Sequence, residues 1–221
     1  MPLDSCCRTS ATDKLFDAKI ARRDLRRFRR RGPDGSTRRL LAAVQEHPLP
    51  PQASLIDVGG GIGAVHHVLL ERGFTRATQI DASAAYLAAA TAEADRLGHG
   101  GKVRFEHGDF VAMAASLPDA DVVTLDRVVC CDADYAGILS AAAARARCLV
   151  AFSYPRSRWL IRAFIAFENA TRRVTGDSFR AYVHLPSAMA AILERAGMRR
   201  SRAGGTWIWA VEVFERGPSN P

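Results

Sequence analysis

Long hydrophobic runs and a regular cysteine pattern are missing from this sequence of 221 residues, and only three of its 31 basic residues are lysines. No apolar stretch approaches the roughly 20 residues needed to cross a bilayer, and no signal-peptide core is present at the N-terminus. We therefore expect a cytoplasmic protein without membrane insertion. The five cysteines are odd in number and lack Cys-x-x-Cys spacing, which argues against disulfides. The length suits one α/β domain with additions.

The net charge of +8 is concentrated near the N-terminus, where residues 22–39 contain nine arginines and two acids. Apolar residues at helical spacing predict a helix over residues 14–31, which Gly32-Pro33-Asp34-Gly35 ends. Ser36 or Thr37 is expected to cap the next helix. The arginines form either a solvated face or a binding surface for an acidic small molecule, an RNA backbone or an anionic membrane. Nucleic acid is possible but not favoured, because no aromatic-interleaved basic patch is recognisable.

An apolar run that leads into a glycine-rich turn occupies residues 55–63. Such a run predicts a buried strand, and Gly59, Gly61 and Gly63 let main-chain N–H groups approach a ligand closely at a helix N-terminus. The ligand expected here is a nucleotide-like cofactor. Gly59, Gly61 and Ala64 also satisfy the dinucleotide-binding pattern, so the turn alone does not separate NAD from an adenosyl ligand.

Two further strand-like segments end in acids. Residues 77–81 end in Asp81, about 20 residues beyond Gly61, where a carboxylate accepts hydrogen bonds from the two hydroxyls of a ribose. Residues 103–110 end in Asp109 and Phe110, which are suited to accept from an adenine amine and to flank its ring. With Asp57 in the first run, three acids at strand ends favour an adenosyl ligand.

With these motifs, residues 36–215 resemble the class I S-adenosylmethionine-dependent methyltransferases, whose first motif reads acid-x-Gly-x-Gly-x-Gly, here Asp57 to Gly63. The resemblance implies a Rossmann-like α/β fold: a seven-stranded, mostly parallel sheet with helices on both faces and an antiparallel last strand. It also implies S-adenosyl-L-methionine as the cofactor. In that family the acid matching Asp57 serves the methionine end, the one matching Asp81 the ribose, and the one matching Asp109 the adenine.

The same resemblance suggests how the chain is divided. Residues 1–39 are expected to form an arginine-rich helical cap, and residues 40–215 the cofactor-binding domain. Residues 119–126 look like the family's fourth strand and residues 206–214 like its last. A lid insertion over about 155–183, with a helix from residue 160 to 174, is expected after a fifth strand at 149–153.

Residues 126–132 follow the fourth strand, where the family places groups that face the transferring methyl. Asp126 is therefore expected to contact the cofactor and to act in catalysis, and Arg127 to contact the substrate. Tyr154 and Arg156 leave the fifth strand at its carboxyl end, where ligands of open α/β sheets bind, and are expected to contact the substrate. His184, after the lid, is expected to act as a general base; the alternative is a packing or capping histidine.

The accepting molecule is narrowed by elimination. The Asn/Asp-Pro-Pro-aromatic signature of amino-methyltransferases is absent, and three lysines offer no obvious proton relay for ribose methylation. We expect methyl transfer to a small, acidic molecule, with oxygen as the acceptor, loosely like the tetrapyrrole-carboxylate O-methyltransferases. The alternatives are an RNA methyltransferase and a non-catalytic nucleotide-binding module that acts through partners.

Two kinds of adjacent pair remain. His66 and His67 follow the glycine turn, and their adjacency is expected to send them to different faces of a helix. Because a sulfonium is already an activated electrophile, methyl transfer requires alignment rather than a metal, and no metal site is expected. The vicinal pairs Cys6-Cys7 and Cys130-Cys131 are either small apolar residues or thiolates for a soft metalloid substrate.

Overall fold

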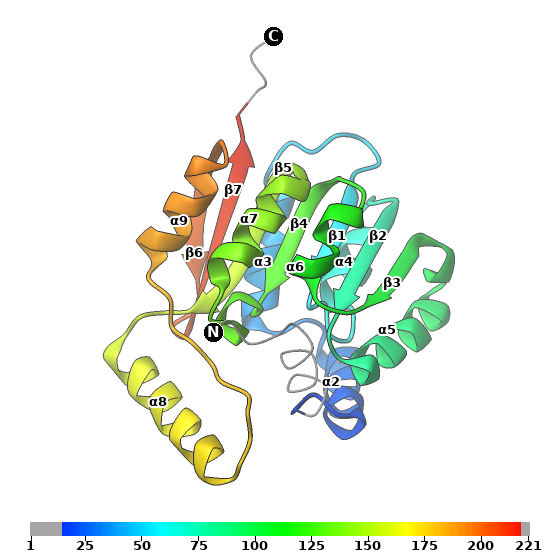
Figure 1. The fold of residues 1–221 in the computed structure, drawn as a ribbon. Coiled ribbons are helices and arrows are strands. Elements are labelled where there is room, and N and C mark those ends of the chain that lie inside the picture. Colours follow the sequence, from blue (N-terminus) through cyan, green and yellow to red (C-terminus); the bar gives the residue numbers. More distant parts are fainter. Residues whose placement is uncertain (1–14, 218–221) are drawn as a thin grey trace.

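A seven-stranded sheet forms the centre of the protein (Figure 1). The computed structural model describes residues 15–217. Across the sheet the strands follow the order β3-β2-β1-β4-β5-β7-β6. Along the chain they are β1 (Ser54–Val58), β2 (Arg76–Asp81), β3 (Val103–His107), β4 (Ala120–Asp126), β5 (Ala146–Pro155), β6 (Met198–Gly205) and β7 (Trp209–Arg216).

Strands β1 to β5 are paired in parallel, and β7 runs antiparallel between β5 and β6. Every residue of β1 is buried, as expected for a strand covered by helices on both faces. The carboxyl ends of the parallel strands meet at one edge of the sheet, which we call the carboxyl edge. The expected Rossmann-like fold with an antiparallel last strand is confirmed.

Helices cover both faces of the sheet. One core cluster includes Leu125, Leu139 and Leu193. The other includes Leu40 and Leu69. The helices are α2 (Ala18–Arg31), α3 (Gly35–Gln45), α4 (Ala64–Glu71), α5 (Ala84–Leu97), α6 (Phe110–Met113), α7 (Tyr135–Arg145), α8 (Trp159–Val174) and α9 (Pro186–Arg195), with 3-10 turns η1 (Gly100–Lys102), η2 (Ala114–Ser116) and η3 (Val129–Cys131).

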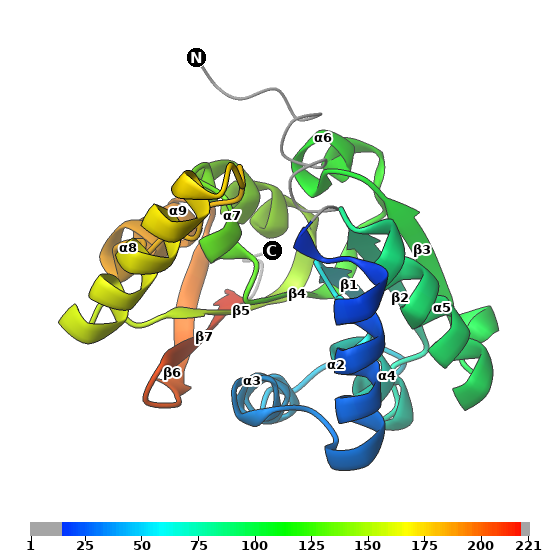
Figure 2. The ribbon, with the colours of Figure 1, turned by 90° about the horizontal axis from the view of Figure 1, so that it is seen from below.

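Two helices project from this layered core at the carboxyl edge. Helix α2 belongs to the leader, by which we mean residues 15–34, and packs against α5. Helix α8 buries only Ile161. Figure 2 looks onto the carboxyl edge and shows α2 and α8 on either side of the strand ends. Within residues 15–217, no helix is both long enough and apolar enough to cross a membrane.

Helix caps account for the main differences from the expected helix boundaries. Helix α2 begins at Ala18 rather than at residue 14, because the Asp17 side chain accepts hydrogen bonds from the backbone of the first turn. The prediction that Ser36 or Thr37 caps the next helix is wrong. Asp34 is the cap and accepts from the N–H groups of both residues.

Helix α3 crosses the expected domain boundary between residues 39 and 40, and its buried face belongs to the core of the sheet. The division of the chain into cap and domain stays a prediction. The last strand begins at Trp209 rather than at residue 206. Thr206 and Trp209 exchange hydrogen bonds across the turn that joins β6 to β7, so residues 206–208 are that turn.

Candidate active site

The glycine-rich turn after β1 adopts backbone conformations that favour glycine. Gly59, Gly61 and Gly63 have φ angles of 58°, 57° and 85°. Gly60 is required for a different reason, since a Cβ there would lie 2.6 Å from a carboxylate oxygen of Asp57. The turn therefore presents bare main chain at the carboxyl edge, as close approach of a cofactor requires.

Asp57 is completely buried beneath this turn. Its Oδ1 accepts a hydrogen bond from Thr124 Oγ1 at 2.8 Å, and its Oδ2 lies 3.1 Å from Nδ1 of His66. These contacts tie the end of β1 to β4 and to the first helix after the turn. Asp57 thus shapes the turn, and its part in holding the methionine end of the cofactor remains a proposal.

Asp81 lies at the end of β2, beside the glycine turn. Its Oδ2 accepts from the N–H of Gly61 at 2.9 Å, and its Oδ1 accepts from the N–H of Ser83 at 2.8 Å. Burial raises the pKa of the Asp81 carboxyl to about 6, because the two backbone hydrogen bonds offset only part of the cost of removing the charge from water. A carboxylate in this position has unmet acceptor capacity, which fits the hydroxyls of a ribose.

Asp109 caps α6 by accepting from the N–H of Val111 at 2.8 Å. Phe110 is buried within the core cluster that also contains Ala114 and Leu117. The cap holds Asp109 at the carboxyl edge, next along the sheet from Asp81. The two acids therefore occupy neighbouring strand ends, as an extended adenosyl ligand requires.

Asp126 and Arg127 end β4. The Asp126 carboxylate accepts hydrogen bonds from Thr37 and Ser153. Arg127 has a φ of 62°, which is uncommon for a residue other than glycine, and such backbone strain concentrates at functional sites. Its guanidinium donates to Asp34 at 2.6 Å and lies 5.8 Å from the ring centre of Trp209.

The ion pair between Arg127 and Asp34 connects the end of β4 to the leader. Burial raises the pKa of the Asp34 carboxyl, but the charge of Arg127 and hydrogen bonds from Thr37 and Ser36 outweigh it and lower that pKa to about 2. Asp34 is therefore ionised at neutral pH. The Arg127 side chain is 36% exposed at the carboxyl edge.

The leader is fastened to α5 beside Asp81, by contacts that the sequence did not reveal. Phe16 packs on Tyr86, with ring centres 5.5 Å apart, and the Tyr86 hydroxyl donates to Asp24 at 2.7 Å. Arg29 pairs at 2.6 Å with Glu93, whose side chain is fully buried. The leader therefore covers the cofactor side of the carboxyl edge. In the sequence, only the helical spacing of its apolar residues indicated that one face of this helix is buried. The pair Cys6-Cys7 lies outside the described residues.

The two residues expected to contact the substrate after β5 have other partners. Tyr154 is buried and donates from its hydroxyl to Glu212 at 2.7 Å. Burial, followed by this hydrogen bond, raises the pKa of the phenol. Arg156 donates to the carbonyls of Thr206 at 2.8 Å and Gly204 at 2.7 Å. Tyr154 therefore ties β7 to β5, and Arg156 holds the β6–β7 turn against β5. Their direct contact with a substrate stays a prediction.

His184 lies on the segment that returns from α8 to α9. Its Nε2 lies 3.0 Å from the carbonyl oxygens of both Val129 and Asp132, and its ring centre lies 4.3 Å from that of Tyr135. Because carbonyls only accept, Nε2 carries the hydrogen, and Nδ1 of the neutral ring keeps a lone pair. The contacts are those of a packing histidine, and the tautomer is also the one a base at Nδ1 needs.

The prediction that His66 and His67 point to different faces is wrong. Their ring centres are 4.2 Å apart, and Nδ1 of His67 lies 3.3 Å from Nδ1 of His99. Burial, helped by the neighbouring histidines, lowers the pKa of His67 to about 3. Within residues 15–217, no group of three or more His, Cys, Asp or Glu side chains is arranged to hold a metal ion.

The cysteines of η3 are free thiols. Both sulfur atoms lie 3.4 Å from the carbonyl oxygen of Arg127. The hydrogen bond with Cys130, together with burial, raises the pKa of the Cys131 thiol, so this group stays protonated. The contacts support the interpretation of Cys130-Cys131 as small packing residues rather than thiolates.

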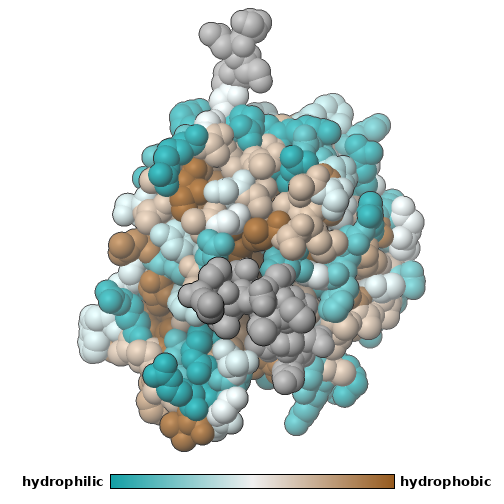
Figure 3. All heavy atoms as spheres, viewed as in Figure 1, coloured by the Kyte–Doolittle hydropathy of each residue, from teal (hydrophilic) through white to brown (hydrophobic). Residues whose placement is uncertain are grey.

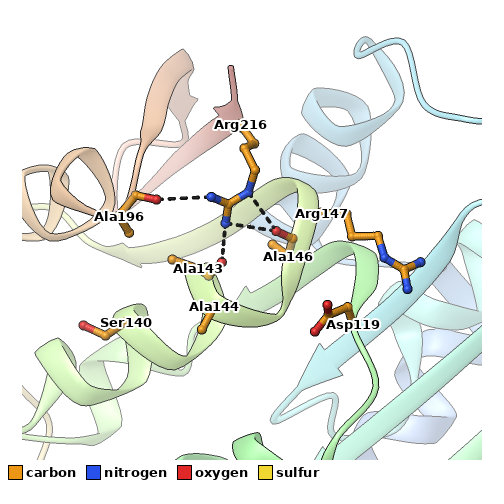
Figure 4. Close-up of a pocket in the computed structure, with 8 residues that line it drawn as sticks. All are labelled: Asp119, Ser140, Ala143, Ala144, Ala146, Arg147, Ala196 and Arg216. Carbon is orange, nitrogen blue, oxygen red and sulfur yellow. Dashed lines mark hydrogen bonds between the residues drawn. The ribbon is translucent and has the colours of Figure 1, made fainter. Parts of the chain in front are cut away.

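A cavity of about 590 Å³ lies away from this site, near the amino ends of β4 and β5. Figure 4 shows the Arg216 guanidinium there, donating to the carbonyls of Ala143, Ala146 and Ala196. Asp119 and Arg147 stand on the other side of the hollow. Arg216 ties the end of β7 to the ends of α7 and α9, which is a structural role.

The sheet order and the glycine turn define a Rossmann-like methyltransferase fold. The methyltransferase domain family model matches residues 55–149, from β1 to β5. The match shows a methyltransferase domain in this part of the chain, and the expected resemblance to S-adenosylmethionine-dependent methyltransferases and the expected cofactor are confirmed. A comparison with curated protein sequences finds no match.

Solved structures with the same fold share little sequence with this chain. Magnesium protoporphyrin IX methyltransferase from Synechocystis PCC 6803 is 18% identical, with a TM-score of 0.68 over 93% of this chain and 98% of that one. An O-methyltransferase family protein from Burkholderia thailandensis is 17% identical, with a TM-score of 0.70 over 93% of this chain and 62% of that one. A structure of the Haloferax volcanii Trm112 methyltransferase activator in complex with a methyltransferase is 16% identical, with a TM-score of 0.68 over 95% of this chain and 99% of that one. At these identities the likeness shows the fold alone.

Proposed function

We propose that the protein methylates an oxygen atom of a small, anionic molecule. The observation that carries this proposal is Arg127, a cation with a partly exposed side chain that is held at the carboxyl end of β4 by Asp34 and Trp209. A planar guanidinium donates paired hydrogen bonds to carboxylates and phosphates. The names of two proteins with the same fold, one acting on magnesium protoporphyrin IX and one an O-methyltransferase, are consistent with this choice.

The residues that would hold the cofactor are those of the three strand ends. The turn of Gly59, Gly61 and Gly63 would face the methionine end with Asp57 beneath it, Asp81 would accept from the ribose, and Asp109 would accept from the adenine with Phe110 beside the ring. Asp126, next along the edge, would contact the cofactor near the reacting methyl. When bound, the cofactor supplies a methyl group on a sulfonium, which transfers to the acceptor oxygen while the electrons of the broken carbon–sulfur bond stay on sulfur.

The chain itself aligns the acceptor and, where the acceptor is a hydroxyl, removes its proton. Arg127 would hold the anionic end of the acceptor, and His184 would take the proton at Nδ1. The hydrogen on Nε2 is fixed by the carbonyls of Val129 and Asp132, which leaves Nδ1 as the only basic ring atom. A carboxylate acceptor carries no proton and would need only the alignment.

The test begins with isotope-labelled cofactor and an extract of small metabolites, from which labelled products are identified by mass spectrometry. With the acceptor in hand, Arg127→Gln is expected to raise its KM, while Arg104→Gln, an exposed arginine on β3, leaves KM unchanged. Labelled RNA with no labelled small molecule would overturn the proposal.

The role of His184 is tested with His184→Gln, whose side-chain amide retains a donor for the two carbonyls but no base. For a hydroxyl acceptor we expect kcat to fall by about 10²–10⁴-fold with cofactor affinity unchanged. A variant with full kcat on a hydroxyl acceptor would show that the histidine only packs.

A further inference from the structure

We propose that the carboxyl edge of this protein docks on an anionic lipid surface, through an apolar strip on α8 and a basic face on α2. The inference goes beyond the proposed function and does not depend on it. It rests on two unusual surfaces that lie at the same edge of the molecule.

The apolar strip consists of large hydrophobic side chains on α8. Trp159 is 75% exposed and Phe167 is 68% exposed. The strip is completed by Leu160, Phe164 and Val174. Positions 160, 164, 167 and 174 are three, four or seven residues apart, so the strip is one face of the helix. Figure 3 shows hydrophobic spheres over this part of the surface, with hydrophilic ones between them.

The strip continues onto the β6–β7 turn. Trp207 and Ile208 are 55% and 47% exposed there, and the Arg158 guanidinium lies 5.2 Å from the centre of the Trp207 ring. Isolated exposed apolar residues are ordinary, but a contiguous group of this size marks an interaction site. Arg162 and Arg173 lie on the flank of the same helix, so the apolar strip has a cationic border.

The basic face belongs to α2, which contains eight cationic residues and a single acid, Asp24. Asp24 and Arg29 are engaged inward with α5, through Tyr86 and Glu93. Five other cations of the helix are exposed, Lys19, Arg22, Arg23, Arg26 and Arg30. The inward contacts hold this helix in place and leave these five cations on the surface.

The two surfaces lie at the same edge of the molecule. Phe16, just before α2, and Phe179, just after α8, meet with ring centres 6.0 Å apart. Figures 1 and 2 show both helices at the carboxyl edge. A surface that combines exposed aromatics with arginines matches the interface of an anionic bilayer, where tryptophan and phenylalanine enter the headgroup region and arginines attract the lipid charge.

The other partners fit one surface but not both. An RNA backbone would attract the basic face and leave the apolar strip exposed to water. A second copy of the chain, joined by a two-fold axis, would bring the same basic faces together. With 16 residues, α8 is too short to span a bilayer, so it would lie in the plane of the interface.

The experiment is flotation of the full chain with vesicles of phosphatidylcholine containing 30% phosphatidylglycerol, against vesicles of phosphatidylcholine alone. We expect preferential flotation with the anionic vesicles, and its reduction by salt. The triple variant Arg22→Gln, Arg26→Gln and Arg30→Gln is expected to bind on the order of 100-fold more weakly, at about fivefold for each arginine near an anionic surface. A control with equal loss of charge at the opposite edge, Arg76→Gln, Arg147→Gln and Arg195→Gln, is expected to keep its binding.

A second variant tests the apolar strip. Phe164→Ser with Phe167→Ser changes two exposed side chains, so folding is retained and vesicle binding falls. Brominated lipid is expected to quench tryptophan fluorescence of the wild type, and Trp159→Phe to remove part of that quenching. The proposal would be overturned if the protein did not float with anionic vesicles, or if both arginine triple variants lost binding equally. It would also be overturned by RNA binding without vesicle binding, or by a dimer that dissociates in the Phe164/Phe167 variant.

Discussion

Replacing Asp81 by asparagine tests how the strand-end acids bind the cofactor. The Asp81 carboxyl is 6% exposed, and burial raises its pKa to about 6, while hydrogen bonds from Ser83 and Gly61 limit the rise. Hydroxyls that donate to this side chain favour its ionised form. Cofactor binding is therefore coupled to loss of the Asp81 proton, and affinity is expected to fall as pH drops below about 6.

The size of the effect follows from that pKa. At pH 5 about one site in eleven is ionised before binding, so the affinity is expected to be about tenfold lower than at pH 8. Asp81→Asn removes the charge and one acceptor. At pH 8 the loss is about 1.5–3 kcal/mol, or roughly 10- to 100-fold, as for hydrogen bonds to a charged group. The variant should also lose the wild-type change in affinity between pH 8 and 5.

Asp81→Asn should weaken cofactor binding but should not lower the stability of the unliganded fold. A raised carboxyl pKa means that the folded state holds the proton more tightly than the unfolded one, so ionisation destabilises the unliganded fold. From the ordinary value of 3.8 to about 6, the difference corresponds to at most about 3 kcal/mol above pH 6, which falls to nothing as pH drops to 3.8. Asp81→Asn is thus expected to keep or raise the melting temperature at pH 7 while it weakens binding.

Calorimetric titration with the demethylated cofactor, between pH 5 and 8, measures both effects. Asp95→Asn serves as the control, because Asp95 is an exposed acid on the same helix that follows Asp81. Parallel pH profiles for wild type and Asp81→Asn would refute the linkage. A large loss of melting temperature with unchanged affinity would show that Asp81 is structural.

Three further predictions concern the turn, the buried histidines and the leader. Gly60→Ala places a Cβ 2.6 Å from Asp57 and is expected to weaken cofactor binding about 10- to 100-fold by titration, whereas Gly101→Ala, in open space, has no effect. Because the pKa of His67 is lowered in the folded state, its contribution to the free energy of unfolding is complete above about pH 6.5 and is lost on acidification. In urea unfolding, the wild type is therefore expected to lose about 2 kcal/mol more than His67→Gln between pH 6.5 and 5. Equal losses in the two proteins would count against this prediction. Arg29→Ala leaves the buried Glu93 with one partner fewer, so it is expected to lower the free energy of unfolding by about 1–2 kcal/mol and to speed proteolysis of the leader. Unchanged proteolysis would contradict the packing of α2 against α5.

The parts of the fold that were predicted correctly from sequence have local signals. Buried parallel strands are short apolar runs, and the glycine turn after β1 combines an acid with glycines at fixed spacing. Helix α5 (Ala84–Leu97) has a local signal of the same kind, because its sequence is rich in alanine. Strand β6 was not located, because Met198-Arg-Arg-Ser-Arg-Ala-Gly-Gly is an exposed edge whose arginines give no apolar alternation.

The contacts that close the candidate site could not be predicted in the same way. Tyr86 and Asp24 are 62 residues apart, Arg29 and Glu93 are 64 apart, and Arg127 and Asp34 are 93 apart. No periodicity within a helix or strand links residues at such separations. The sequence identified Arg127 as a site residue from its position after a strand, but its partner and its positive φ are properties of the assembled fold.

The arginine-rich leader shows why a run of charge is not one kind of surface. Two interpretations were open from sequence, a solvated face or a binding face, and both treated the arginines as equivalent. The helix separates them, because Arg29 turns inward to a buried carboxylate while Arg22, Arg26 and Arg30 face solvent. An inward ion pair fixes the orientation of α2, and a fixed orientation is what gives the outer arginines a common direction. The anchoring of Arg29 and the binding role proposed for the outer face are therefore linked, and loss of the first should weaken the second.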